Sequence, residues 1–222
     1  MSILRGLRPL LKHLFKYRQT HPTNTVVKVK IIDAPQFGPM FRFNDANVYW
    51  TMHLLSNGKR IGRKRLAEEV GIGEGSMRRI LDTLSDWDYI SIKQTGIIIT
   101  KAGQSFLDQI PIQPVDIFLE GSVIGSEQQG VIVKGVANKV NNGMEQRDAG
   151  IKVGAEGCTT IVYRDGNLCI PPDWNLDAER PEIAKKIRDE YGMKPNDALI
   201  IGGGNTKQSA VVAAISAALE LF

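Results

Sequence analysis

Residues 63–84, RKRLAEEVGIGEGSMRRILDTL, contain two short amphipathic helical patterns joined by a glycine turn. The first pattern places Leu66, Ala67 and Val70 on one helical face. The second repeats apolar residues at i, i+3, i+4 and i+7: Met77, Ile80, Leu81 and Leu84. Gly71 stands between them, and glycine can adopt the left-handed conformation of a helix end without a Cβ penalty. This spacing predicts a helix-turn-helix.

A further helix is expected just before this motif, over residues 47–56. Its apolar side chains recur at helical spacing on one face: Val48, Met52 and Leu55. Asn44 or Asp45 is expected to cap its start, because a short polar side chain there can accept a hydrogen bond from a free backbone N–H group.

A β-hairpin is expected after the motif, over residues 89–100. Two β-rich runs flank Gln94, Thr95 and Gly96, so that glycine falls at the turn. Residues 101–109 then predict another helix. Three helices followed by a hairpin are the element order of a winged helix, in which the hairpin is the wing.

Two segments, IGRKRLAEEVGIGEGSMRRIL (61–81) and GIIITKAGQSFL (96–107), resemble the winged-helix transcriptional regulators of archaea and bacteria. The segment RDAGIKVGAEGCTTIVYRDG (147–166) resembles, less specifically, the uncharacterised C-terminal α+β domain of archaeal-type members. The resemblance implies DNA binding by the first half and effector binding, dimerisation or both by the second. Winged helices also dock onto proteins, so a protein-docking role stays open.

Charge divides the chain in the same way. Residues 1–112 hold 17 basic and 9 acidic residues, a net +8, whereas residues 113–222 hold 11 and 15, a net −4. A chain of 222 residues has room for two domains, and we expect them at 1–112 and 113–222. The basic excess falls on the half with the motif, which favours a polyanionic partner.

The second motif helix is expected to lie on duplex DNA. With its apolar face buried, Gly75 and Arg79 point outward, flanked by Ser76 and Arg78. The guanidinium fork of arginine matches guanine O6 and N7 in the major groove, and the N–H groups of a helix start suit phosphate. The expected DNA-binding residues are Lys59, Arg60, Arg63, Lys64, Gly75, Ser76, Arg78, Arg79, Lys93 and Gln94.

The N-terminal segment adds two expected elements. Residues 3–18 predict an amphipathic helix that packs on the domain or forms a dimer interface, or else contacts DNA or an anionic membrane surface. Residues 23–32 predict a strand.

The second half mixes strands and helices. Strands are expected at 129–140 and 198–201, and helices at 144–153 and 181–191. A terminal helix follows, so this half is expected to form a compact α+β domain and the whole chain an α+β protein.

The two cysteines flank a predicted hairpin that turns at Asp165 and Gly166. Such a turn pairs Val162 with Cys169 and leaves Cys158 about 13 Å from the position opposite Cys169, whereas a disulfide needs Cα atoms within about 7 Å. We therefore expect two free thiols and a reducing, cytoplasmic setting. Histidine is absent near both cysteines, which makes a zinc site improbable.

A glycine-rich element, GGGNTK, links the last expected strand to the terminal helix. It lacks the glycine before lysine that a Walker loop needs, and it is not G-x-G-x-x-G. Glycines and a helix start can nevertheless hold an anion. The expected effector-binding residues are Gly202, Gly203, Gly204, Asn205, Thr206 and Lys207. The alternative is a tight turn with Asn205 or Thr206 as N-cap.

Catalytic residues do not stand out, so we expect no enzyme, no cofactor and no metal site. Because no apolar run is long enough to span a bilayer, we expect no membrane partner. The sequence instead predicts a ligand-responsive, homodimeric transcriptional regulator that binds double-stranded DNA and a small anionic effector. A rival is an enzyme acting on a phosphorylated metabolite or nucleotide at GGGNTK. The terminal helix, with Val211 and Ile215, is either a dimer surface or buried within its own domain.

Overall fold

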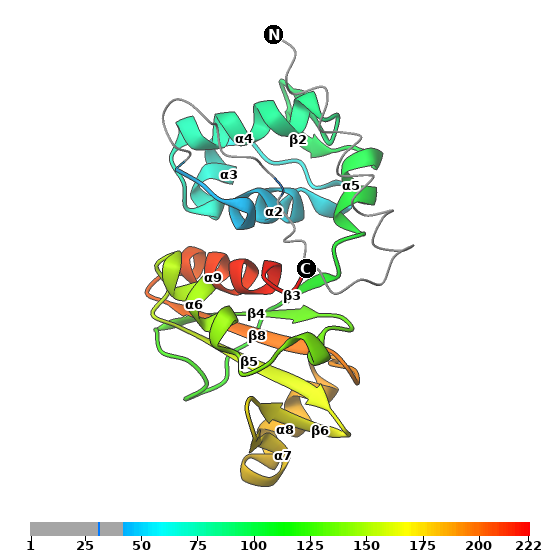
Figure 1. Ribbon diagram of the computed structural model, residues 1–222. Coiled ribbons are helices and arrows are strands. Elements are labelled where there is room, and N and C mark those ends of the chain that lie inside the picture. Colours follow the sequence, from blue (N-terminus) through cyan, green and yellow to red (C-terminus); the bar gives the residue numbers. More distant parts are fainter. Residues whose placement is uncertain (1–30, 32–41) are drawn as a thin grey trace.

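The computed structural model describes Ile31 and residues 42–222 (Figure 1). The helix expected at 3–18 and all but one residue of the strand expected at 23–32 lie outside the described residues. Within the described part, no helix is both long and apolar enough to cross a membrane.

The N-terminal part follows the predicted element order. Its elements are α2 (Asp45–Leu54), a short 3-10 helix η2 (Ser56–Gly58), α3 (Arg63–Val70), α4 (Glu74–Asp86), the hairpin strands β1 (Ile90–Lys93) and β2 (Gly96–Ile99), and α5 (Lys101–Leu107). Asn44 caps α2, as one of the two expected residues, through a reciprocal pair of hydrogen bonds with Asn47. The two hairpin strands pair antiparallel, with Lys93 opposite Gly96 at the turn.

The α3–α4 turn has the expected glycine geometry. Gly71 ends α3 at φ 75°, and its N–H donates to the carbonyl oxygens of Ala67 and Glu68. Both predicted apolar stripes are buried and form the core between the helices: Leu66, Ala67, Val70, Met77, Ile80, Leu81 and Leu84.

The C-terminal part is built on one six-stranded sheet of order β3-β4-β8-β5-β6-β7, with antiparallel pairing at every neighbouring pair. The strands are β3 (Ile112–Val115), β4 (Glu127–Val133), β5 (Gly157–Arg164), β6 (Asn167–Ile170), β7 (Trp174–Asn175) and β8 (Ala198–Gly204). The helices are η3 (Ala137–Lys139), α6 (Met144–Lys152), α7 (Leu176–Glu179), α8 (Pro181–Asp189) and α9 (Lys207–Leu219). The whole chain is α+β, as expected, and the expected boundary at 112 and 113 falls within β3.

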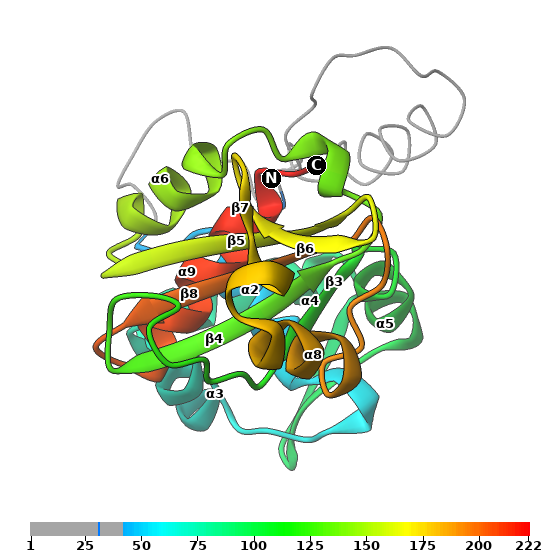
Figure 2. The ribbon, with the colours of Figure 1, turned by 90° about the horizontal axis from the view of Figure 1, so that it is seen from below.

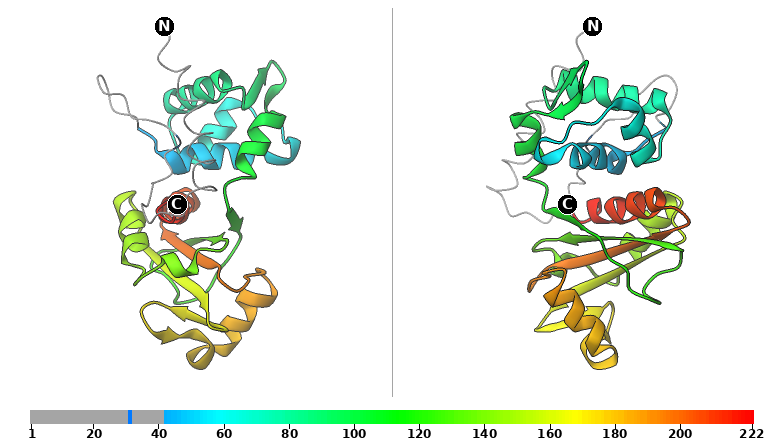
Figure 3. Two further views of the ribbon diagram at one scale, coloured as in Figure 1. Left: turned by 45° about the vertical axis from the view of Figure 1, so that its right-hand side comes forward. Right: turned by 180° about the vertical axis from the view of Figure 1, so that it is seen from behind.

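Helices cover both faces of this sheet. α6 and α9 pack on one face, and α8 packs on the other, as the view from below shows (Figure 2). α9 also contacts α2, so this helix lies between the sheet and the N-terminal helices (Figures 1 and 3). One continuous apolar cluster consequently runs from α2, α3 and α4 through α9 to the sheet.

The position of α9 corrects one expectation. Val211 and Ile215 are buried within the chain, together with most of the helix. The apolar face of α9 is therefore occupied by the sheet and by α2, and it does not form a dimer surface. The alternative prediction, that this helix is buried, is confirmed. It is buried by α2 of the N-terminal half as well as by its own domain.

Two expected strand bounds were wrong. The strand expected at 129–140 ends at Val133, because the chain turns at Gly135 with φ 69° and then enters η3. The strand expected at 198–201 continues through Gly204, since its glycines pair with β4 on one side and β5 on the other.

The predicted cysteine hairpin is confirmed. β5 and β6 turn at Asp165 and Gly166, and Val162 lies opposite Cys169. Both cysteines are free thiols. Cys158 is buried under α6, where burial raises the pKa of its thiol to about 12.

Candidate nucleic-acid interface

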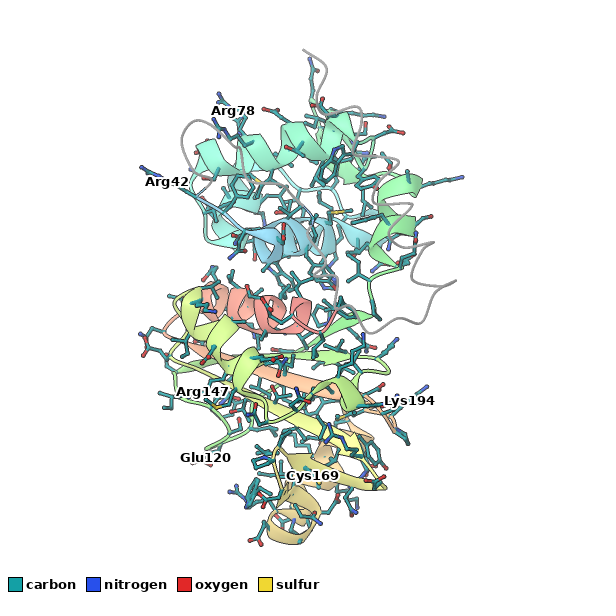
Figure 4. All side chains as sticks on the ribbon, viewed as in Figure 1. Arg42, Arg78, Glu120, Arg147, Cys169 and Lys194 are labelled. Atoms are coloured by element: carbon teal, nitrogen blue, oxygen red, sulfur yellow. The ribbon has the colours of Figure 1, made fainter. Side chains whose placement is uncertain are left out.

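The exposed side of α4 carries the predicted base-contacting residues. Its opposite side is fully buried, so Gly75, Arg78 and Arg79 are exposed. Arg78 projects from the end of the molecule that is remote from the six-stranded sheet (Figure 4). α4 is therefore held by its buried face, while Arg78 and Arg79 lie on its exposed side.

The starts of α3 and α4 lie close together. Arg63 at the start of α3 approaches Glu74 at the start of α4, with Nη2 and Oε2 3.9 Å apart. Both side chains are exposed, and such a pair contributes little to stability, so it leaves Arg63 available to phosphate. Gly73 precedes α4, and no described side chain caps the helix start. The uncapped start of α4 thus lies beside Arg63, the first residue of α3.

The wing brings together residues that are far apart in sequence. Ile61 bridges to Ile97 of β2, which places Lys59 and Arg60 beside the hairpin turn. Arg60 donates a hydrogen bond from Nη1 to Oγ1 of Thr95 in that turn. Lys59, Arg60 and the two wing residues predicted from sequence therefore form one group: Lys59, Arg60, Lys93 and Gln94.

All ten predicted residues lie on this N-terminal part, and nine are exposed while Ser76 is half-buried. They form two groups, one at the starts of α3 and α4 and one at the wing. Sequence reasoning missed Thr95, which orients Arg60. Its position within the predicted hairpin turn was the available signal.

A histidine near this surface adds no charge to it. His53, in the last turn of α2, stacks on Trp50 with ring centroids 4.9 Å apart. Burial and then the nearby Lys59 cation lower the pKa of His53, so the imidazole is neutral at pH 7. The positive charge of the surface comes from lysine and arginine.

The predicted effector residues have a different arrangement. Gly202, Gly203 and Gly204 are buried in β8 instead of forming a loop. A Cβ on Gly202 would lie 2.4 Å from the carbonyl oxygen of Ala210 in α9, and one on Gly203 would lie 2.1 Å from that of Ile124. The glycines therefore permit close packing of backbone on both faces of the sheet, and the structure gives them no ligand-facing surface.

The remaining polar residues of this element bind other parts of the chain. Thr206 caps α9 by a reciprocal pair with Ser209, which confirms the N-cap alternative. Lys207 donates from Nζ to Asp116 and to the carbonyl oxygen of Gln128, at 2.9 and 3.0 Å. Asn205 donates to Glu156. Asn205, Thr206 and Lys207 therefore hold the end of β8 and the start of α9 in place.

Among residues 42–222, no group of three histidine, cysteine, aspartate or glutamate side chains could hold a metal ion.

Comparison with known proteins identifies two regions of similarity. Residues 47–105 match the family model "PH0730-like, N-terminal domain", and residues 124–221 match "Domain of unknown function (DUF4443)". No curated protein matches the chain. Among solved structures, hypothetical protein PH0730 from Pyrococcus horikoshii OT3 is 29% identical, with a TM-score of 0.64, and the match covers 79% of this chain and 91% of that one. In sequence and in fold, the chain is thus similar to a two-domain archaeal protein.

Proposed function

We propose that this chain is a transcriptional regulator that binds double-stranded DNA through α4, α3 and the wing. The observation that carries the proposal is the pair of exposed arginines in the first half of α4, Arg78 and Arg79, on a helix whose start lies beside Arg63 of α3. A buried stripe on the opposite side of α4 holds this helix in place.

The two groups of residues would have different roles. α4 would enter the major groove, where Arg79 or Arg78 can bind guanine through a bidentate fork. Arg63 and Lys64 on α3 would contact the phosphate backbone, as would the wing group. Phosphate contacts position the protein, whereas base contacts give sequence preference.

The proposal includes a homodimer. Two copies would contact two half-sites and double the number of phosphates neutralised. Because α9 is buried between the sheet and α2, the dimer must use another surface.

The test is selection of bound fragments from random duplex DNA with the purified full chain. We expect a recurring sequence, and an affinity that falls by about a thousandfold between about 50 and 200 mM salt if six or more phosphates are contacted. Repeating the selection with a metabolite extract tests for an effector.

A matched pair of variants locates the interface. Arg79→Ala should lose the sequence preference, whereas Arg147→Ala should not, since Arg147 is also an exposed arginine but lies on α6 in the C-terminal part (Figure 4). Equal loss in both variants, or salt-independent binding, would exclude the proposed surface.

A further inference from the structure

The turn of the helix-turn-helix rests directly on the first turn of α9. A Cβ on Gly71 would lie 2.7 Å from Cβ and 2.8 Å from Cγ of Gln208. The Cβ of Gln208 is fixed by its backbone and cannot move away without moving α9. Gly71 thus serves two purposes: it adopts the positive φ of a helix end, and it leaves room for Gln208.

Gln208 also binds α3 by a directed contact. Its Nε2 donates a hydrogen bond to the carbonyl oxygen of Glu68, at 3.2 Å. Glu68 lies in the last turn of α3, and its carbonyl oxygen also accepts a hydrogen bond from the N–H of Gly71 at 3.2 Å. Gln208 therefore gives a carbonyl at the helix end a second donor, from a residue 140 positions away in the sequence.

The position of Gln208 is fixed from both sides. Before it, Lys207 is held by Asp116 and by the carbonyl oxygen of Gln128 on β4. After it, Ser209 is held in the cap with Thr206. The C-terminal part of the chain thus determines where the Gln208 side chain meets α3.

We propose that Gln208 is a positioning residue, which holds the α3–α4 turn in the geometry that presents α4 to DNA. This inference rests on the proposed function. α3 would contact phosphates while α4 contacts bases, so the angle between these helices decides whether both contacts can form together. Through Gln208 the C-terminal part would act directly on the turn that sets this angle.

The test compares two substitutions of Gln208 by unbranched side chains of similar length. Gln208→Met keeps the packing but removes the donor, and Gln208→Lys restores a donor that can reach the Glu68 carbonyl. Gln113→Met, at an exposed glutamine of β3, is the matched control. The first measurement is hydrogen exchange at the amides of Gly71 and Ile72, which both donate to the Ala67 carbonyl oxygen.

We expect Gln208→Met to exchange about fivefold faster at these two amides, as befits the loss of one hydrogen bond, and Gln208→Lys to restore the wild-type rate. The second measurement is affinity for the duplex recovered by selection and for a mixed-sequence duplex. Gln208→Met should weaken the first by about fivefold and leave the second unchanged.

The outcomes separate the two proposals. Unchanged exchange in Gln208→Met would overturn the positioning role whatever the DNA result. Faster exchange with an unchanged ratio of specific to mixed-sequence affinity would also overturn it. If the wild type binds neither duplex, DNA binding is the proposal that fails, and the exchange experiment alone decides whether Gln208 holds the turn.

Discussion

The hydroxyl of Tyr49 donates a hydrogen bond to the carbonyl oxygen of Ile112 at 3.0 Å, and so joins α2 to the first residue of β3. Tyr49 is only 2% exposed. Burial raises the pKa of its hydroxyl, which therefore remains a protonated donor at physiological pH. Together with the packing of α9 on α2, this bond couples the helical part of the chain to the sheet.

Tyr49→Phe should therefore destabilise the whole chain. The substitution leaves a buried carbonyl without this partner, and we expect the free energy of unfolding to fall by about 1–2 kcal/mol. Urea unfolding followed by circular dichroism measures the change. Tyr191→Phe is the control, since Tyr191 is half-buried at the end of α8 and its ring is approached by Lys186. An equal loss in both variants would show that the Tyr49 bond has no special role.

Gly202→Ala should also destabilise the fold, because the added methyl group would overlap the backbone of α9. It would lie 2.4 Å from Ala210 O and 2.6 Å from Ala214 N. We expect a loss of about 1–3 kcal/mol, the usual range for overpacking. Gly75→Ala, where a Cβ meets nothing within 4 Å, should be neutral or slightly stabilising. A Gly202→Ala protein as stable as the wild type would contradict the close strand–helix packing.

The N-terminal elements could be predicted because their signals are local. The apolar spacing from Leu66 to Leu84 predicts two amphipathic helices, and Gly71 marks the turn between them. The β5–β6 hairpin was predictable for the same reason, since Asp165 and Gly166 determine the register of the residues beside them.

The features that the sequence did not predict depend on contacts between segments far apart in the chain. β8 extends through Gly204 because β4 and β5 lie on either side, which the glycine pattern alone does not reveal. The short strands β3 and β7 depend on their partners. The burial of α9 and the role of Gln208 depend on how α2 and α3 meet the sheet. Glycine at 202–204 has the same appearance in a ligand loop as in a tightly packed strand, and only the neighbouring backbone distinguishes them.

Lys64→Ala should weaken DNA binding without changing its sequence preference. Lys64 is exposed on α3, and the proposed function assigns it a phosphate contact. Loss of one such contact should lower affinity for all duplexes alike and reduce the slope of log K against log salt by about 1. Titrations at several salt concentrations with selected and mixed-sequence duplexes measure both quantities. A changed sequence preference with an unchanged slope would instead place Lys64 at a base.

The carboxylate of Asp177 on α7 accepts hydrogen bonds from both α8 and β6. Arg188 donates to it through both Nη atoms, at 2.5 and 2.6 Å, and the N–H of Leu168 donates at 2.7 Å. The Arg188 guanidinium also lies over the Tyr163 ring, 5.0 Å from its centroid. About a quarter of each side chain in the pair is exposed, 25% for Asp177 and 26% for Arg188. α7, α8 and β6 are thus joined through one ion pair.

Asp177→Asn should therefore reduce stability in a pH-dependent way. The hydrogen bond from Arg188 is the main cause that lowers the pKa of Asp177 in the folded chain. Because this pKa is lower in the folded chain, the ionised carboxylate stabilises the fold at pH values above its unfolded pKa of about 4. That stabilisation is lost as the pH falls through the folded-state pKa. At pH 7 we expect wild type to exceed Asp177→Asn by about 1–3 kcal/mol, with the difference shrinking below about pH 4. Asp173→Asn, at an exposed carboxylate, should match wild type throughout. Urea unfolding from pH 7 to 3 measures this, and a pH-independent difference would mean that charge is not the cause.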